Sequence, residues 1–332
     1  MQPSSWPRSG QKYLLGSPQV QRGRLILEVA AELSAVANWP HHQPLVYMRA
    51  QGAQEWGVCL FGSDSWEVVN QVASREVTFA IVNPGAILAL AIRGLGPYSE
   101  PVPVRAITVL PQIDQLGFAV RADTGLVSLT DLRDRRYPLR VSVRGQRNHS
   151  GLVLIRETVA ALGFTLEDID SWGGHVSYDQ GTPDLRIAAF ERGEIDAIWD
   201  EAMPMYAETA LSLGMRFLRF DEEHLVKLEA MGLRRVRLDK ETYPTIEEEI
   251  WAIDFSGWIV YTHADTPDDL VTAFCDALEV RKDRIPFTAR DGVAGRKELP
   301  LDWMCRDTKE GPLYVPLHPA AERFWRQKGY IE

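Results

Sequence analysis

Short strand-like runs alternate with helix-period segments along the whole chain, and this alternation constrains the fold more than any other feature of the sequence. Residues 45–49 (LVYMR) and 78–82 (TFAIV) are rich in β-forming residues. Residues 25–37 carry apolar side chains at helical spacing, follow a strand-like run at 12–17 and a loop at 18–23, and end before Pro40. Alternation of this kind predicts an α/β protein with mainly parallel sheets.

Two longer strand-like segments, at 104–110 and 251–263, bracket the middle of the chain on both sides. A block enclosed in this way is typical of one domain inserted into another through a pair of crossing strands. We therefore expect one lobe from residues 11–110 plus 240–332, and an inserted second lobe from residues 111–239, with a ligand cleft between them.

The charge balance and the cysteines exclude several classes of protein. The 332 residues carry 36 Lys and Arg against 46 Asp and Glu, a net charge of −10, which argues against a nucleic-acid-binding groove. The three cysteines are far apart and form no CxxC motif, so neither a disulfide framework nor a zinc site is expected. His41 and His42 are adjacent and lack further ligands at metal-binding spacing. No P-loop, GxGxxG or GxSxG motif occurs, so we expect no cofactor.

Residues 1–30 contain basic and proline residues but no apolar stretch of the length that a secretory signal needs. The longest apolar stretch, at 78–92, is broken by Asn83-Pro84-Gly85 and is shorter than the roughly 20 residues of a membrane span. These features predict a cytoplasmic protein without membrane insertion. A periplasmic location remains the alternative if a signal has been removed or the start is misassigned.

Several motifs occur in an order that resembles one family. The run AITVLPQIDQLGFAVRADTGLVSLTDLRDRRYPLRVSV at 106–143 is similar to a stretch of TAXI-type solute-binding proteins of TRAP transporters. Further similar elements follow that order: VTFAIVNPGA, ALGFTLEDI, AAFERGEIDAIW and PLHPAAERFWRQKGY. The resemblance implies the two-lobed type II periplasmic-binding-protein fold, a small organic anion such as a carboxylate as ligand, and a membrane permease as a possible partner.

The loop at 144–151 (RGQRNHSG) lies between a predicted strand and a predicted helix, and it is the main candidate binding site. The carboxyl ends of strands and the free N–H groups of a helix N-terminus favour an anionic ligand there. The guanidinium groups of Arg147, chiefly, and Arg144 could clamp a carboxylate. The alternative is a solvated helix cap, in which Ser150 bonds the first turn. The resemblance favours binding, because the family's ligand loop falls at this position.

Polar residues at other strand ends complete the candidate site. Ser17 and Asn83 follow predicted strands, although Asn83 could equally be a turn residue. Asp200 and Glu201 follow the strand ending at Trp199 and could pair with the arginines or only cap the next segment. Residues 63–65 are interpreted as a helix cap rather than as ligand contacts. The full candidate set is Ser17, Asn83, Ser142, Arg144, Arg147, Asn148, His149, Ser150, Trp199, Asp200 and Glu201.

An enzyme on the same scaffold is the alternative function, since fold does not fix function. Some cytoplasmic relatives of type II binding proteins resemble aromatic-acid decarboxylases, and His149 with Asp200 or Glu201 is the only obvious acid–base pair here. Because no catalytic motif is recognisable, the sequence favours a binding protein.

Overall fold

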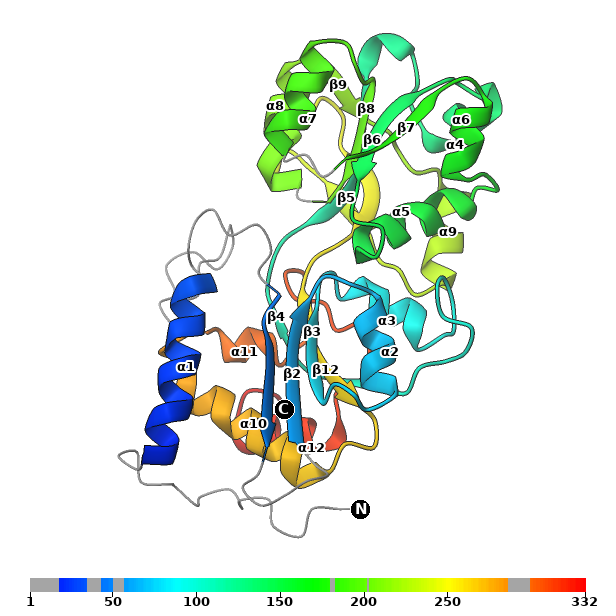
Figure 1. Cartoon of the computed structure of the whole chain (residues 1–332). Coiled ribbons are helices and arrows are strands. Elements are labelled where there is room, and N and C mark those ends of the chain that lie inside the picture. Colours follow the sequence, from blue (N-terminus) through cyan, green and yellow to red (C-terminus); the bar gives the residue numbers. More distant parts are fainter. Residues whose placement is uncertain (1–17, 35–42, 50–56, 180–182, 202, 286–298) are drawn as a thin grey trace.

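The computed structural model describes residues 18–34, 43–49, 57–179, 183–201, 203–285 and 299–332. These residues form two lobes, which Figure 1 shows one above the other, joined by two crossing segments. The described part of the chain contains no helix long and apolar enough to cross a membrane. The predicted strand at 12–17, Ser17, His41 and His42 lie outside the described residues.

The first lobe is built on a sheet whose strands run in the order β1-β2-β3-β12-β4. The pair β2–β3 is parallel, whereas β1–β2, β3–β12 and β12–β4 are antiparallel. The strands are β1 (Leu45–Arg49), β2 (Gly57–Ser63), β3 (Phe79–Val82), β4 (Val104–Leu110) and β12 (Trp258–His263). The helices are α1 (Pro18–Ser34), α2 (Glu67–Ala73), α3 (Ala86–Ala91), α10 (Asp268–Arg281), α11 (Leu301–Met304) and α12 (Pro319–Gln327).

Alternation along the strands divides the core of the first lobe between the two faces of its sheet. Phe79 and Ile107 pack into a cluster with α10, α11 and α12, which also holds Trp325. Ala80 points to the opposite face, where α2 and α3 bury their apolar side chains. Val109 joins that face although it is two residues from Ile107, because the register between β4 and β12 shifts at Ile107. The sheet is therefore covered on both sides, as its almost continuous apolar strands predict.

The second lobe contains a sheet in the order β10-β11-β5-β8-β6-β7, with β9 paired to β5. Its strands are β5 (Gln115–Arg121), β6 (Arg140–Arg144), β7 (His175–Asp179), β8 (Ala197–Asp200), β9 (Met215–Phe217), β10 (Arg235–Leu238) and β11 (Ile250–Asp254). The helical segments are η1 (Ala122–Thr124), α4 (Leu129–Arg135), α5 (Ser150–Ala160), α6 (Leu166–Ser171), α7 (Pro183–Glu191), α8 (Met203–Ser212) and α9 (Glu222–Ala230).

The two connections between the lobes are the short segments 111–114 and 255–257, which bind each other. Phe255 N–H donates to the Asp114 carbonyl at 3.1 Å, and Gly257 N–H donates to the Gln112 carbonyl at 3.0 Å. The Ser256 hydroxyl donates to the Asp114 carbonyl and accepts from the Asp114 N–H, both at 3.0 Å. Movement of one lobe against the other would act on this paired crossing.

The prediction of a two-lobed α/β fold with two crossing connections is confirmed, and three details of it are wrong. Only β2–β3, β6–β7 and β6–β8 are parallel among the described strand pairs, so the sheets are mixed rather than mainly parallel. Residues 251–263 form two strands in different sheets, and β11 extends the second lobe past residue 239. Residues 18–23, predicted as a loop, begin helix α1, where Pro18 occupies a first-turn position that proline tolerates.

Candidate functional site

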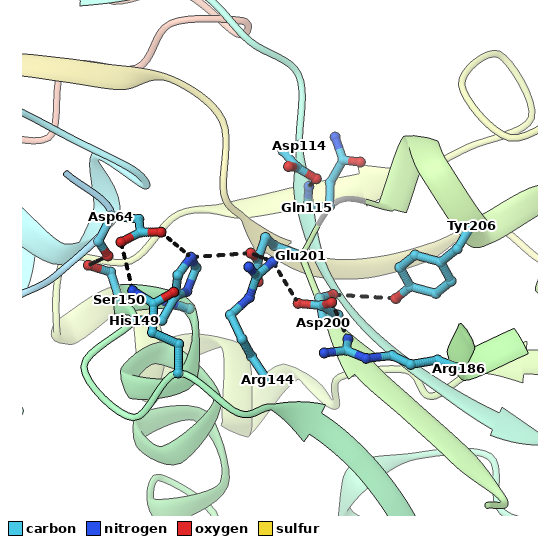
Figure 2. Close-up of polar contacts among 12 residues, drawn as sticks. Asp64, Asp114, Gln115, Arg144, His149, Ser150, Arg186, Asp200, Glu201 and Tyr206 are labelled. Carbon is cyan, nitrogen blue, oxygen red and sulfur yellow. Dashed lines mark hydrogen bonds and ion pairs between the residues drawn. The ribbon is translucent and has the colours of Figure 1, made fainter. Parts of the chain in front are cut away.

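A cluster of charged side chains lies where the second sheet faces the first lobe, and we call it the charge cluster. Figure 2 shows its members, most of which are largely or fully buried: Asp64, Arg144, His149, Arg186, Asp200 and Glu201. Strands β6 and β8 are parallel neighbours, so their carboxyl ends meet at one edge of the sheet. Arg144 ends β6, and Asp200 ends β8 with Glu201 next in the chain. The sequence predicted this meeting of strand ends.

Arg144 is neutralised by carboxylates of its own chain. Its guanidinium binds the Glu201 carboxylate directly and lies 3.5 Å from Asp200 Oδ1. Arg186 of α7, which is 3% exposed, binds the other Asp200 oxygen. Two guanidinium groups therefore face three carboxylates in the cluster, and neither of these cations lacks an anionic partner.

Glu201 occupies the helix N-terminus that the sequence analysis assigned to an anionic ligand. A Cβ atom placed on Gly151, in the first turn of α5, would lie 2.6 Å from Glu201 Oε2. Only glycine leaves room for the carboxylate so near the helix backbone. Because the positive end of the helix dipole favours negative charge, Glu201 takes the position expected for a bound anion.

His149 connects the helix start to carboxylates of both lobes. Its Nδ1 accepts a hydrogen bond from the Gly151 N–H at 3.0 Å, and its Nε2 lies 3.6 Å from both Asp64 Oδ2 and Glu201 Oε1. Burial and the neighbouring Arg144 lower the pKa of His149 to about 4. The imidazole is therefore neutral at pH 7, with the proton on Nε2, where it points at the two carboxylates.

Asp200 shows the opposite shift. Burial, reinforced by the charge of Glu201, raises the pKa of Asp200 to about 7, although Arg144 and Arg186 act against the rise. Asp200 therefore changes its protonation near neutral pH. The cluster combines a histidine that resists protonation with a carboxyl group that keeps its proton to a higher pH than an ordinary aspartate does.

The lobes touch directly beside the cluster, as Figure 2 shows for Asp64 and Ser150. The backbone N–H and the hydroxyl of Ser150 donate to the Asp64 carbonyl at 2.9 and 2.8 Å. Gln146 Nε2 donates to Asp64 Oδ1 at 2.9 Å, and Trp66 N–H donates to the Asn148 carbonyl at 3.2 Å. The structure therefore has its lobes in contact around residues 64–66 and 146–150.

The structure brings Arg144, His149, Ser150, Asp200 and Glu201 together, and Asn148 joins the lobes through Glu67 Oε2 at 3.1 Å. The other candidates lie elsewhere. The prediction that Arg147 chiefly holds the ligand is not supported by its position, since it is exposed and its guanidinium lies 5.0 Å above the Tyr178 ring. Trp199 packs on Phe118 in the core. Ser142 is fully buried within β6, and Asn83 follows β3 with its buried Oδ1 lacking a hydrogen-bond partner.

Sequence reasoning missed three contributors to the cluster. Asp64 follows β2 and was interpreted as part of a helix cap at residues 63–65. Ser65 confirms that cap, because its hydroxyl accepts from the Glu67 N–H at 3.2 Å, but the Asp64 carboxylate faces His149 instead. The strand-end criterion used for Asp200 applied equally to Asp64. Arg186 lies inside an ordinary helical pattern, and Gln43, which donates to Asp64, lies before a strand, so neither gave a signal.

A cavity of about 240 Å³ lies elsewhere in the second lobe, between β9, α8 and residues 245–250. None of the predicted site residues lines it. Among the described residues, no group of three or more His, Cys, Asp or Glu side chains is placed to hold a metal ion. The charge cluster, rather than this cavity, is the part of the molecule whose chemistry matches the sequence prediction.

Replacement of His149 by glutamine should change how the stability depends on pH. Below about pH 6.5 the unfolded chain takes up a proton on His149, which the folded protein resists down to about pH 4. Acidification through that window therefore costs the wild type up to about 3 kcal/mol that the variant does not lose. The measurement is urea denaturation of both proteins from pH 8 to pH 4, and Asp200, present in both, cancels in the difference. A difference that does not vary with pH would contradict the buried neutral imidazole.

Comparisons with known proteins show what this chain is similar to. The alkanesulfonate-binding protein SsuA from Xanthomonas axonopodis pv. citri, bound to MOPS, is 17% identical, with 48% of each chain covered and a TM-score of 0.29. The aliphatic sulphonate binding protein SsuA from Escherichia coli is 12% identical, with 63% of this chain and 53% of that chain covered and a TM-score of 0.32. PhnD1 from Prochlorococcus marinus, in complex with methylphosphonate, is 12% identical, with 80% of this chain and 84% of that chain covered and a TM-score of 0.38.

The chain thus spans about half the length of both SsuA proteins, and similarities this low carry no argument about function. A comparison with curated proteins gives no match. The family comparison is decisive, because one family model matches residues 62–329, which include both sheets apart from β1 and the first residues of β2. This chain belongs to the NMT1-like family.

Proposed function

We propose that this chain is a solute-binding protein that closes its two lobes over a small organic acid at the charge cluster. The observation that carries the proposal is the place of Glu201, whose carboxylate binds Arg144 at the N-terminus of α5. A site that holds a carboxylate of its own chain has the chemistry to hold the carboxylate of a ligand. Glu201 therefore marks the position of the ligand's acidic group.

The charges of the cluster require that the ligand replaces Glu201 rather than joins it. Two guanidinium groups already face three carboxylates, so an added anion would meet no free cation. When the Glu201 side chain swings away, Arg144 is released for the ligand beside the start of α5. The charge of the cluster then stays the same, because one carboxylate takes the place of another.

Unpaired polar atoms support this exchange. Glu201 Oε2, Asp200 Oδ1 and Arg144 Nε are buried without a hydrogen-bond partner. Buried polar groups nearly always have partners, so an unpaired donor beside unpaired acceptors indicates that the internal pairing is incomplete. A ligand with a carboxylate and a second, donating polar group would satisfy more of these atoms than Glu201 does.

The TAXI type and a permease partner remain part of this proposal, supported by the order of the sequence motifs. The cytoplasmic location predicted from residues 1–30 also remains a prediction. Fractionation of the native host tests both points, since recovery in the periplasm would favour transport and contradict the predicted compartment.

Arg144→Ala should weaken binding of the best organic acid by about 1.5 to 3 kcal/mol, the range for hydrogen bonds to charged groups. Arg147→Ala is the matched control, because Arg147 lies three residues away on the same loop but faces Tyr178 at the surface. We expect its affinity to match that of the wild type. The measurement is calorimetric titration with a panel of aliphatic and aromatic mono- and di-acids. Equal losses in the two variants, or a loss only in Arg147→Ala, would refute the assignment of Arg144.

An enzyme is the second candidate, favoured by the opposite pKa shifts of His149 and Asp200. Groups held on opposite sides of their ordinary pKa values are typical of acid–base catalysis. The same titrations test this candidate, since each acid is recovered afterwards and analysed by mass spectrometry. Release of carbon dioxide with loss of the acid would establish a decarboxylase, and unchanged acid supports the binding protein.

A further inference from the structure

The cavity of about 240 Å³ in the second lobe lies along the edge of strand β9. Met215, Arg216 and Phe217 are successive residues of this strand, and all three line the cavity. Successive side chains of a strand point to opposite faces of the sheet, so three neighbours line one cavity when the edge of their strand borders it. The segment at 245–248 and Ile250 line it as well.

The backbone of β9 has free hydrogen-bonding groups along this edge. The strand pairs antiparallel with β5, and the Leu218 N–H donates to the Phe118 carbonyl at 2.9 Å. Because bonded and non-bonded positions alternate along such a pair, the N–H and C=O groups of Met215 and Phe217 point away from β5. No residue that the structure describes forms a hydrogen bond with these groups. A ligand in the cavity can therefore both donate to the strand and accept from it.

Charged side chains without partners line the cavity from both segments. Arg216 belongs to β9, and Glu247 and Glu248 belong to the segment that follows Thr245. None of these three side chains forms an ion pair or a hydrogen bond with another described residue. A ligand that carries one positive and one negative group would bring an opposite charge to each side, and such charge-assisted hydrogen bonds are the strong ones.

The apolar residues of the lining limit the kind of ligand further. Phe217, Ile246 and Ile250 are buried, whereas Glu247 and Glu248 are exposed. The carboxylates therefore lie at the mouth of the cavity, and apolar side chains line its interior. A volume of about 240 Å³ is below the roughly 300–1,000 Å³ of sites for drug-sized ligands, so a small molecule fits.

We propose that this cavity is a second binding site, which takes a small apolar α-amino acid such as leucine. The carboxylate of the amino acid binds Arg216, its ammonium group binds the carboxylates of Glu247 and Glu248, and the edge of β9 completes the hydrogen bonds of both groups. The side chain of the amino acid packs against the buried apolar lining. No member of the charge cluster lines the cavity, so this site does not depend on the function proposed for the cluster.

The test is calorimetric titration of the full chain with leucine and with two analogues that each lack one charge. N-acetyl-leucine has no ammonium group, and leucinamide has no carboxylate. We expect leucine to bind and each analogue to bind at least about tenfold more weakly, because each loses its hydrogen bonds to one charged side of the cavity. Absence of leucine binding, or binding of either analogue as tight as that of leucine, would overturn the proposal.

Replacement of the charged residues should affect leucine and the analogues differently. Arg216→Ala should weaken leucine binding about tenfold or more and leave the weak binding of leucinamide unchanged, since leucinamide has no carboxylate for Arg216 to bind. The double variant E247Q/E248Q should weaken leucine binding but not that of N-acetyl-leucine. Equal losses for leucine and for the analogue in either variant would indicate a general change of structure and contradict the assigned contacts.

Two further variants separate this site from the rest of the second lobe. Arg192→Ala is the matched control, because Arg192 is an exposed arginine of the same lobe that pairs with Glu194 and does not line the cavity. Its affinity for leucine should equal that of the wild type. Arg144→Ala disrupts the charge cluster and should also leave leucine binding intact. Loss of leucine binding in Arg144→Ala but not in Arg216→Ala would place the amino acid at the charge cluster and refute a second site.

Discussion

Arg186→Met should destabilise the folded protein by about 3 to 5 kcal/mol, as expected when one partner of a buried ion pair is removed. Arg186 and Asp200 are both almost fully buried, and Arg186 binds one oxygen of that carboxylate. In the variant, Asp200 keeps Arg144 at 3.5 Å but still has Glu201 beside it. The free energy of unfolding should be measured in urea at about pH 8, where Asp200 is ionised, and the loss should shrink towards pH 6 as the carboxyl becomes protonated.

Two further variants separate the buried pair from a general effect of losing arginine. Arg326→Met removes a surface ion pair with Glu322, in which both side chains are about half exposed. This variant should change the free energy of unfolding by less than about 1 kcal/mol. The double variant R186M/D200L replaces both charges by apolar side chains and should recover much of the loss. If Arg186→Met is no more destabilising than Arg326→Met, the pair contributes nothing to the fold.

The order of strands and helices was predictable, because it depends on local apolar spacing and on turn residues. The prediction succeeded for β1 and β4, whose bounds match those expected. The direction of strand pairing was not predictable in the same way. Strand β5 pairs with β8, β9 and β11, all antiparallel, although long stretches of chain separate them. Such pairings are set by tertiary packing, which no local pattern records.

The candidate site was predictable to the extent that it consists of strand ends. Arg144, Asp200 and Glu201 follow strands that the sequence identified, and the loop at 144–151 lies at the start of α5 as expected. Which residues of that loop belong to the site depends on the orientation of each side chain. Arg144 and Arg147 belong to one loop and have the same chemistry, but only Arg144 points at the cluster. That Glu201 would bind Arg144 beside the start of α5 could not be predicted from the sequence, because the sequence shows the position of neither side chain.

Glu201→Gln should tighten the binding of an organic acid by about tenfold to a hundredfold. In the wild type, the acid must displace the Glu201 carboxylate from Arg144, which costs the charge-assisted hydrogen bond of about 1.5 to 3 kcal/mol between them. Glutamine has nearly the same shape but carries no charge, so it competes less for the guanidinium. The dissociation constant is measured by calorimetric titration with the acid that the wild type binds best.

The sign of this effect distinguishes two roles for Glu201. Weaker binding in Glu201→Gln would mean that the carboxylate contacts a donating or cationic group of the ligand, and the proposed exchange would be wrong. Glu167→Gln is the matched control, because it also removes a carboxylate from an arginine, Arg156, but at the exposed surface. Its affinity should equal that of the wild type. His149 Nε2 lies 3.6 Å from both Glu201 Oε1 and Asp64 Oδ2. Exchange leaves the His149–Asp64 contact between the lobes in place, so the tighter binding in Glu201→Gln arises at Arg144 alone.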